Sequence, residues 1–183
     1  MAYPVLTIET APAGAKDALK AAKGKFGFVP NLIGVLANAP AVPKAFLGLA
    51  GAFEETSLSP AEQQVVLLAA SYENDCEYCV AVHTALAGMV KVPSPVVEAL
   101  RAGTPLPDRR LEALRRFTLF VVRERGRPRK ADLDAFFKVG YGEAQVLEVI
   151  LGVAVKTLSN YANHVTKTPL DAAFEKAAWT KAA

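Results

Sequence analysis

The sequence predicts an all-α protein, built as one domain of about seven to nine helices over residues 1–183. Residues that start and end helices divide the chain into segments of helical length. Within these segments apolar residues recur at helical spacing, and the alternating run Val5–Ile8 is too short to indicate a sheet. Hydrophobic residues make up 52% of the chain and charged residues 21%. The chain can therefore bury a sizeable core, and no internal repeat divides it.

Proline and glycine mark the first three helices, because proline suits the first turn of a helix and glycine its end. We expect these helices at about residues 15–23, from residue 30 to before Pro40, and at about residues 43–55, following Pro12, Pro30 and Pro43.

The clearest helix start is Ser59-Pro60-Ala61-Glu62. Ser59 suits the N-cap and Pro60 the first helical position, while Glu62 can bond back to the N-cap in a capping box. The apolar run Val65–Ala70 that follows predicts a buried helix.

Asn74 and Asp75 interrupt this buried helix and suit the cap of the next one, expected at about residues 75–90 with Cys76 in its first turn. Four more helices are expected at about residues 95–103, 108–124, 131–138 and 143–164. Pro169 separates the last of them from an alanine-rich tail.

The charge pattern excludes an extended nucleic-acid surface. The net charge is only +3, and nucleic-acid binding requires basic residues clustered on one face. The one dense basic cluster is interrupted by Gly126 and Pro128, so we expect a solvated loop between helices; it contains Arg123, Arg125, Arg127, Arg129 and Lys130.

The sequence shows no pattern of a secretory signal or a membrane span, and we therefore expect a cytoplasmic protein without a membrane partner. The start, Met1 to Pro4, lacks the basic and apolar pattern of a secretory signal. The apolar run Val146–Val155 is broken by Glu148 and Gly152 and is too short to span a bilayer. The apolar residues Val146, Val149, Ile150 and Val153 give this last long helix a broad apolar face, from which we expect a homo-oligomer.

The chemistry of the chain is expected at its two cysteines, Cys76 and Cys79. A pair so close in sequence cannot staple a long loop, which favours a reactive or metal-binding pair. At about 100° per residue on a helix, Cys79 and His83 lie within about 60° of the direction of Cys76. A thiolate beside a helix N-terminus and a histidine becomes more acidic, and a second thiol one turn away can trap a sulfenic acid as a disulfide.

The motif allows other interpretations. Haem attachment requires a histidine directly after the second cysteine, where Val80 stands, and a thioredoxin-type motif requires a preceding strand. A zinc site could use Cys76, Cys79, His83 and His164, but tetrahedral zinc rarely takes three ligands from one face of a continuous helix. Two buried core cysteines with a satisfied histidine remain the simplest alternative. We expect neither a metal nor another cofactor.

The motif Cys76-x-x-Cys79-x-x-x-His83, preceded by a capped apolar helix and the turn Asn74-Asp75, resembles the AhpD-like, carboxymuconolactone decarboxylase superfamily. The resemblance is specific over about residues 57–90 and looser over residues 28–56. The stretch Asn160–His164 looks like the peroxidase-related branch. The resemblance implies an AhpD-like helical bundle that forms homo-oligomers (a dimer, trimer or hexamer, in this family often a trimer or hexamer) and reduces peroxides. It also implies Cys79 as the peroxidatic thiol, Cys76 as the resolving thiol, and His83 as the base that draws the proton from Cys79.

The chain departs from this family pattern at residue 64. The family's alkyl hydroperoxidases have a relay glutamate twelve residues before the first cysteine, where this chain has Gln64. An amide can hold a hydrogen bond but cannot accept a proton near neutral pH. Glu62 points to the opposite side of the same helix, and we expect the cap to use it. Tyr161 and His164 are therefore candidates for completing the proton relay.

The predicted function is thus a thiol-dependent peroxidase or disulfide reductase with an antioxidant role, acting on a peroxide with a thiol or dithiol as electron donor. One alternative is a carboxymuconolactone decarboxylase-like lyase that acts on a lactone acid and needs no thiols. Another is an oligomeric binding protein with a vestigial site.

Overall fold

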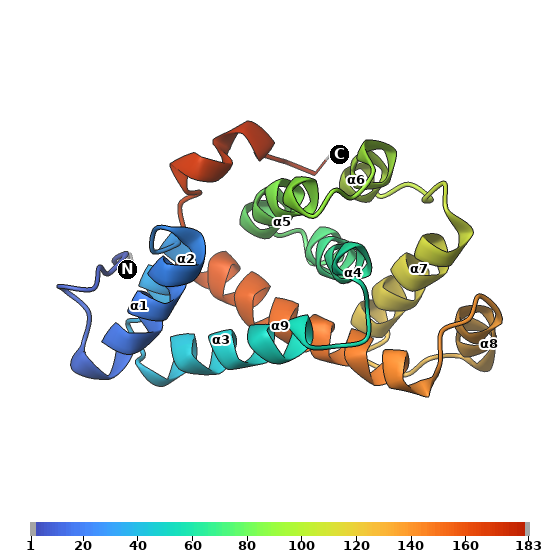
Figure 1. Ribbon diagram of the computed structural model, residues 1–183, viewed down its shortest axis with the longest axis horizontal. Coiled ribbons are helices and arrows are strands. Elements are labelled where there is room, and N and C mark those ends of the chain that lie inside the picture. Colours follow the sequence, from blue (N-terminus) through green and yellow to red (C-terminus); the bar gives the residue numbers. More distant parts are fainter. Residues whose placement is uncertain (1–2, 182–183) are drawn as a thin grey trace.

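The computed structural model describes residues 3–181, which form nine α-helices and a short 3-10 helix and contain no strand (Figure 1). The prediction of an all-α fold is confirmed. The helices are α1 Ala13–Phe26, α2 Asn31–Leu36, α3 Ala41–Glu54, α4 Pro60–Glu73, α5 Glu77–Met89, α6 Ser94–Ala102, α7 Arg109–Arg123, α8 Lys130–Lys138 and α9 Glu143–Thr166, followed by η1 Ala172–Ala177. The expected absence of a secretory signal rests partly on Met1 and Ala2, which lie outside the described residues.

Helix α4 is the centre of the bundle. Figure 1 shows it surrounded by α5, α6, α7 and α9, and it packs against all four. Its residues from Val65 to Ala70 are at most 7% exposed, as expected for a helix that is apolar on every side. The predicted capping box opens it: Ser59 Oγ accepts from the Glu62 amide at 3.3 Å, and Glu62 Oε2 accepts from the Ser59 amide at 2.9 Å.

The turn from α4 to α5 differs from the prediction by one residue. Asn74 ends α4 rather than capping α5, and Asp75 adopts a left-handed conformation with φ 56°. The chain therefore reverses before the new helix starts, and Cys76 becomes the N-cap residue of α5 instead of a residue in its first turn. The Asn74 side chain donates to Asn160 Oδ1 of α9 at 2.9 Å. As a result, Cys79 rather than Cys76 lies in the first turn of α5.

Helix α9 packs closely on α3 and α4 because it has glycine at position 152. A Cβ atom there would lie 2.7 Å from both Phe53 Cε2 and Val66 Cγ1, so any side chain would push these helices apart.

Gly152→Ala should therefore lower the free energy of unfolding, by roughly 1–3 kcal/mol, because overpacking a dense core forces backbone and side chains to shift. Gly48→Ala is the matched control. Gly48 is also a helical glycine, but a Cβ there meets nothing within 4 Å, so alanine should stabilise the protein by about 0.5–1 kcal/mol. Urea unfolding of both variants measures this difference, and equal effects would contradict the packing argument.

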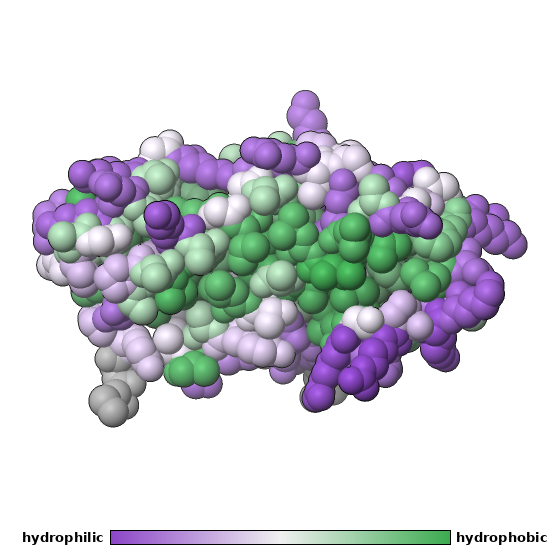
Figure 2. Space-filling view, turned by 90° about the horizontal axis from the view of Figure 1, so that it is seen from below, coloured by the Kyte–Doolittle hydropathy of each residue, from purple (hydrophilic) through white to green (hydrophobic). Residues whose placement is uncertain are grey.

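The predicted apolar face of α9 is mostly used by the protein's own core. Val149 is fully buried, and Val146 and Val153 are partly buried against the core, whereas Ile150 is 43% exposed. Figure 2 shows a hydrophobic band across the face seen from below Figure 1, where α3 and α9 lie. Leu147 on α9 is 68% exposed.

The basic cluster lies in the predicted place, between α7 and α8. Arg123 pairs with Glu73 at 2.7 Å, and Arg129 pairs with Asp132 at 2.8 Å. Part of its charge is thus neutralised locally. Within residues 3–181, no helix is both long enough and apolar enough to cross a lipid bilayer.

Candidate active site

The two thiols lie between the start of α5 and the middle of α9. Cys76 is 1% exposed and Cys79 2%, and both are reduced. Asn163 Nδ2 on α9 donates to Cys79 Sγ at 3.3 Å and lies 3.8 Å from Cys76 Sγ. Ser159 Oγ, one turn earlier on α9, lies 3.9 Å from Cys79 Sγ. Helix α9 therefore supplies a polar wall to a thiol pair that α5 presents.

None of the α9 residues that contact the thiols or His83 was a predicted site residue, and the most consequential of them is Lys156. It is only 2% exposed, and its Nζ lies 3.0 Å from His83 Nε2. A signal for it was present: Lys156, Ser159, Asn160 and Asn163 are polar residues that recur at helical spacing inside an apolar helix. Such a stripe marks a polar face that turns inward.

The two thiols have opposite acidities. Burial by itself would raise the pKa of Cys79. The hydrogen bond with Cys76, the charge and hydrogen bonding of Lys156, and the hydrogen bond with Ser159 outweigh it and hold that pKa well below its usual value. The hydrogen bond with Cys79, burial and the neighbouring thiolate charge raise the pKa of Cys76. Cys79 is thus the more acidic of the two thiols, and Cys76 is the less acidic one.

His83 does not hold the position predicted for a base acting on Cys79. Its Nε2 faces the Lys156 ammonium, which can only donate, so Nε2 accepts and Nδ1 carries the proton. Nδ1 then donates to Gln64 Oε1 at 3.0 Å. Burial and then the charge of Lys156 lower the pKa of His83 well below its usual value, so the ring is neutral at neutral pH. No hydrogen bond joins His83 to Cys79 among the described residues, and Lys156 instead acts on the thiolate.

Three of the predicted relay residues lie elsewhere. Glu62 is occupied by the cap and by Tyr141, whose hydroxyl donates to Oε1 at 2.8 Å. Tyr161 is 57% exposed on the surface of α9. His164 Nε2 lies 3.3 Å from the Asp75 carbonyl oxygen, on the Cys76 side of the thiol pair. Of the four candidates, only Gln64 contacts His83, because the others point away from the inner face that joins α4, α5 and α9.

Cys79, His83 and Lys156 line a cavity of about 290 Å³. Its walls come from α1 to α5, from α9 and from η1, and they are mainly apolar. They include the rings of Phe26, Phe46, Phe53 and Phe174 together with Leu32, Ile33, Leu67, Val82 and Leu86. Such a cavity suits a small apolar molecule presented to a thiolate.

A buried hydrogen-bond network ties the chain's last segment to this cavity. The Tyr78 hydroxyl donates to Asp171 Oδ2 at 2.6 Å, and the Asn31 amide donates to Asp171 Oδ1 at 2.8 Å. Burial and the carboxylate of Asp171 raise the pKa of Tyr78, so the phenol remains a donor. This network holds Phe174 over the cavity.

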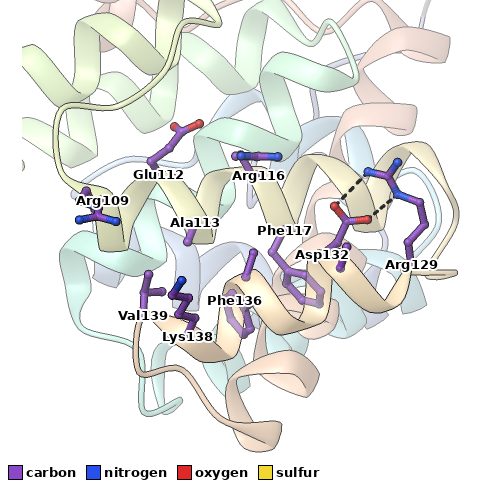
Figure 3. A pocket seen from close by; sticks show the side chains of 12 residues that line it. Arg109, Glu112, Ala113, Arg116, Phe117, Arg129, Asp132, Phe136, Lys138 and Val139 are labelled. Carbon is purple, nitrogen blue, oxygen red and sulfur yellow. Dashed lines mark hydrogen bonds and ion pairs between the residues drawn. The ribbon is translucent and has the colours of Figure 1, made fainter.

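A larger hollow of about 700 Å³ lies between α7 and α8 (Figure 3). Its labelled lining includes Arg109, Glu112 and Arg116, and the ion pair of Arg129 with Asp132 closes one end. Its lining contains neither cysteine nor histidine, so it offers no group for thiol chemistry. Within residues 3–181, no group of three His, Cys, Asp or Glu side chains is arranged to hold a metal ion.

The sequence and fold are similar to those of known proteins. Residues 40–106 match the carboxymuconolactone decarboxylase family. A peroxidase-related protein of Ralstonia eutropha JMP134, described as an alkylhydroperoxidase AhpD core, has a similar structure with a TM-score of 0.83. It is 24% identical, and the match covers 94% of this chain and 93% of that one. A peroxidase-related protein of Silicibacter sp. TM1040 has a TM-score of 0.79 at 20% identity, with 95% and 92% covered.

The debrominase Bmp8, solved in complex with 2,3,4-tribromopyrrole, has a TM-score of 0.76 at 17% identity, with 90% of this chain and 89% of that one covered. No curated protein matches this sequence. Residues 40–106, which hold both thiols and His83, thus match the carboxymuconolactone decarboxylase family, and the chain has the AhpD-like fold that the resemblance in its sequence predicted.

Proposed function

We propose that this protein is a thiol-dependent peroxidase that reduces a small organic hydroperoxide with its two cysteines. The observation that carries the proposal is the position of Cys79. Its sulfur receives a hydrogen bond from Asn163, is stabilised as a thiolate by Lys156, and lines an apolar cavity beside a second, protonated thiol. A buried thiolate with a resolving thiol is the arrangement that peroxide reduction requires.

The reaction balances with the residues present. The Cys79 thiolate attacks the terminal oxygen of ROOH, the O–O bond breaks, and an alkoxide leaves while Cys79 becomes a sulfenic acid. Lys156 gives the alkoxide a proton and recovers one from solvent. The Cys76 thiol then attacks Cys79 Sγ, which expels water and forms the disulfide. One hydroperoxide, two cysteines and one proton become an alcohol, water and a disulfide.

In this scheme His83 is a positioning residue. Its neutral Nε2 accepts a hydrogen bond from Lys156, and its Nδ1–H is fixed by Gln64. Because Gln64 is uncharged, it does not attract the Lys156 ammonium away from the Cys79 thiolate, as a glutamate at this position would. Lys156 thus supplies the charge and proton transfer that the family's relay glutamate would otherwise control.

Titration of free thiols before and after one equivalent of cumene hydroperoxide tests the proposal. We expect the loss of both thiols, with a mass decrease of two hydrogens in the peptide that contains Cys76 and Cys79. The Cys79→Ser variant should keep its remaining thiol. If the wild-type protein lost no thiol, the lactone lyase or the oligomeric binding protein would be favoured instead.

A second candidate, reductive dehalogenation of a small aromatic ring, is favoured by the phenylalanine-lined cavity around Cys79. The Cys79 thiolate would attack the halogen, the ring carbanion would take a proton from Lys156, and Cys76 would displace halide from the sulfenyl halide. Incubation with 2,3,4-tribromopyrrole distinguishes the two activities, since only dehalogenation releases bromide as the thiols are lost.

The predictions of a homo-oligomer and a cytoplasmic location stay predictions. The exposed Leu147 and Ile150 of α9 support self-association. Sedimentation at micromolar protein concentration tests it, and a monomer under those conditions would count against it.

A further inference from the structure

The thiol pair faces two different hollows. Cys79 lines the apolar cavity, whereas Cys76 lines a groove of about 580 Å³ between the start of α5, the end of α9 and the segment 167–180. We call it the Cys76 groove; its lining includes Cys76, Asn163, His164, Thr168, Leu170 and Trp179. Tyr78 lines both hollows. Each of the two cysteines therefore lines a different hollow.

Thiol–disulfide exchange selects between the two sulfurs. A donor thiolate attacks one sulfur of a disulfide and expels the other, and the exchange is faster when the expelled thiol is the more acidic one. Hydrogen bonding and the charge of Lys156 make Cys79 the more acidic thiol. The favoured attack is therefore on Cys76, with the electron pair of the S–S bond leaving on Cys79.

Asn163 lines the Cys76 groove and carries a buried acceptor without a partner within residues 3–181. The side chain is 5% exposed, its Nδ2 donates to the thiols, and its Oδ1 has no hydrogen-bond partner among the described residues. A buried acceptor of this kind is costly unless a donor completes it. The second thiol of a dithiol, still protonated while the first attacks Cys76 as a thiolate, is such a donor.

We propose that the thiol that regenerates the protein binds in the Cys76 groove and attacks Cys76 Sγ, on the opposite side of the thiol pair from the cavity that admits the peroxide. This inference rests on the proposed function. The donor thiolate forms a mixed disulfide with Cys76 while Cys79 leaves as a thiolate. A second donor thiol then attacks the donor's own sulfur, and Cys76 leaves and takes up a proton. Two donor thiols become one donor disulfide.

The test separates reduction from oxidation. The protein is first oxidised with diamide, so that the Cys76–Cys79 disulfide forms without peroxide, and its reduction by dithiothreitol is then followed. Thr168→Trp and Thr180→Trp both fill the groove, and each should slow reduction by about tenfold or more, because exchange requires an aligned approach. Two variants at separate positions guard against misfolding of one. Ala173→Trp, at an exposed residue outside both hollows, should be reduced like the wild type.

Ala50→Trp, in the apolar cavity, completes the design. It should slow oxidation by cumene hydroperoxide more than it slows reduction by dithiothreitol. The inference is overturned if the two groove variants are reduced at the wild-type rate, or if Ala50→Trp is the variant that blocks reduction. If cumene hydroperoxide failed to oxidise the wild type, that result would contradict the proposed peroxidase function alone. The reduction experiment would still test the groove, since diamide forms the disulfide without peroxide.

Discussion

Replacing Lys156 by methionine should slow the oxidation of Cys79 by cumene hydroperoxide at neutral pH by about 10²- to 10⁴-fold, the range that general acid–base assistance supplies. Two effects contribute. The pKa of Cys79 should rise once the charge and hydrogen bonding of Lys156 are gone, so less thiolate is present. The leaving alkoxide also loses its proton donor. Rapid-mixing measurement of Cys79 oxidation gives the rate directly.

The loss should not come from unfolding. Lys156 is 2% exposed, and methionine fills a similar volume without a buried charge. Cys79, left without its cationic partner, can take up a proton instead of remaining a buried unpaired charge. Lys167→Met, at an exposed residue beyond the end of α9, is the matched control and should keep the wild-type rate of oxidation. A Lys156→Met protein that reacts as fast as the wild type would remove Lys156 from the mechanism.

Replacing Cys76 by serine should abolish repeated turnover while leaving the first oxidation of Cys79 intact. Serine keeps a hydroxyl that can donate to the Cys79 thiolate, as the Cys76 thiol does, but it cannot form a disulfide. Sulfenic acid should therefore accumulate at Cys79 and react with dimedone, which mass spectrometry locates on the peptide. An excess of peroxide should then drive Cys79 to the sulfinic acid.

Cys79→Ser is the complementary control, and it should show neither the sulfenic acid nor turnover. Continued turnover of the Cys76→Ser variant with dithiothreitol would mean that Cys76 is dispensable for resolution. A dimedone adduct on Cys76 in the Cys79→Ser variant, formed at the rate seen for Cys79, would reverse the two roles.

Much of the fold could be predicted because its signals are local. The capping box of Ser59 and Glu62 and the apolar run Val65–Ala70 specify α4 from neighbouring residues alone. The α4–α5 turn was harder to predict. Asp75 adopts a left-handed conformation there. The hydrogen bond from Asn74 to Asn160 joins residues 86 positions apart, and no local sequence pattern indicates such a contact.

The candidate site was predictable only where it lies on one helix. Cys76, Cys79 and His83 fall on one segment, so their spacing indicates that they belong together. Lys156 is 73 residues from His83, and its role depends on how α9 packs against α5. The hydrogen bond from His83 Nδ1 to Gln64 could be anticipated from the family pattern, but the hydrogen bond that His83 Nε2 accepts from Lys156 could not. Tertiary packing thus assigned to Lys156 the contact that sequence reasoning gave to His83.

Whether Lys156 and Asn163 hold Cys79 as a thiolate is tested by acid titration of that thiolate. Its ultraviolet absorbance is followed as the difference between the wild type and Cys79→Ser. In the folded protein the pKa of Cys79 is held well below the ordinary thiol value. At and above the ordinary value Cys79 is therefore fully ionised, and the thiolate is lost only as pH falls through the lower folded pKa. We expect the thiolate signal to persist unchanged from about pH 8.5 through neutrality and to disappear only in acid. A signal that is half lost near about pH 8.5, the value of an unperturbed cysteine, would show that Lys156 and Asn163 do not stabilise the Cys79 thiolate and would contradict the mechanism.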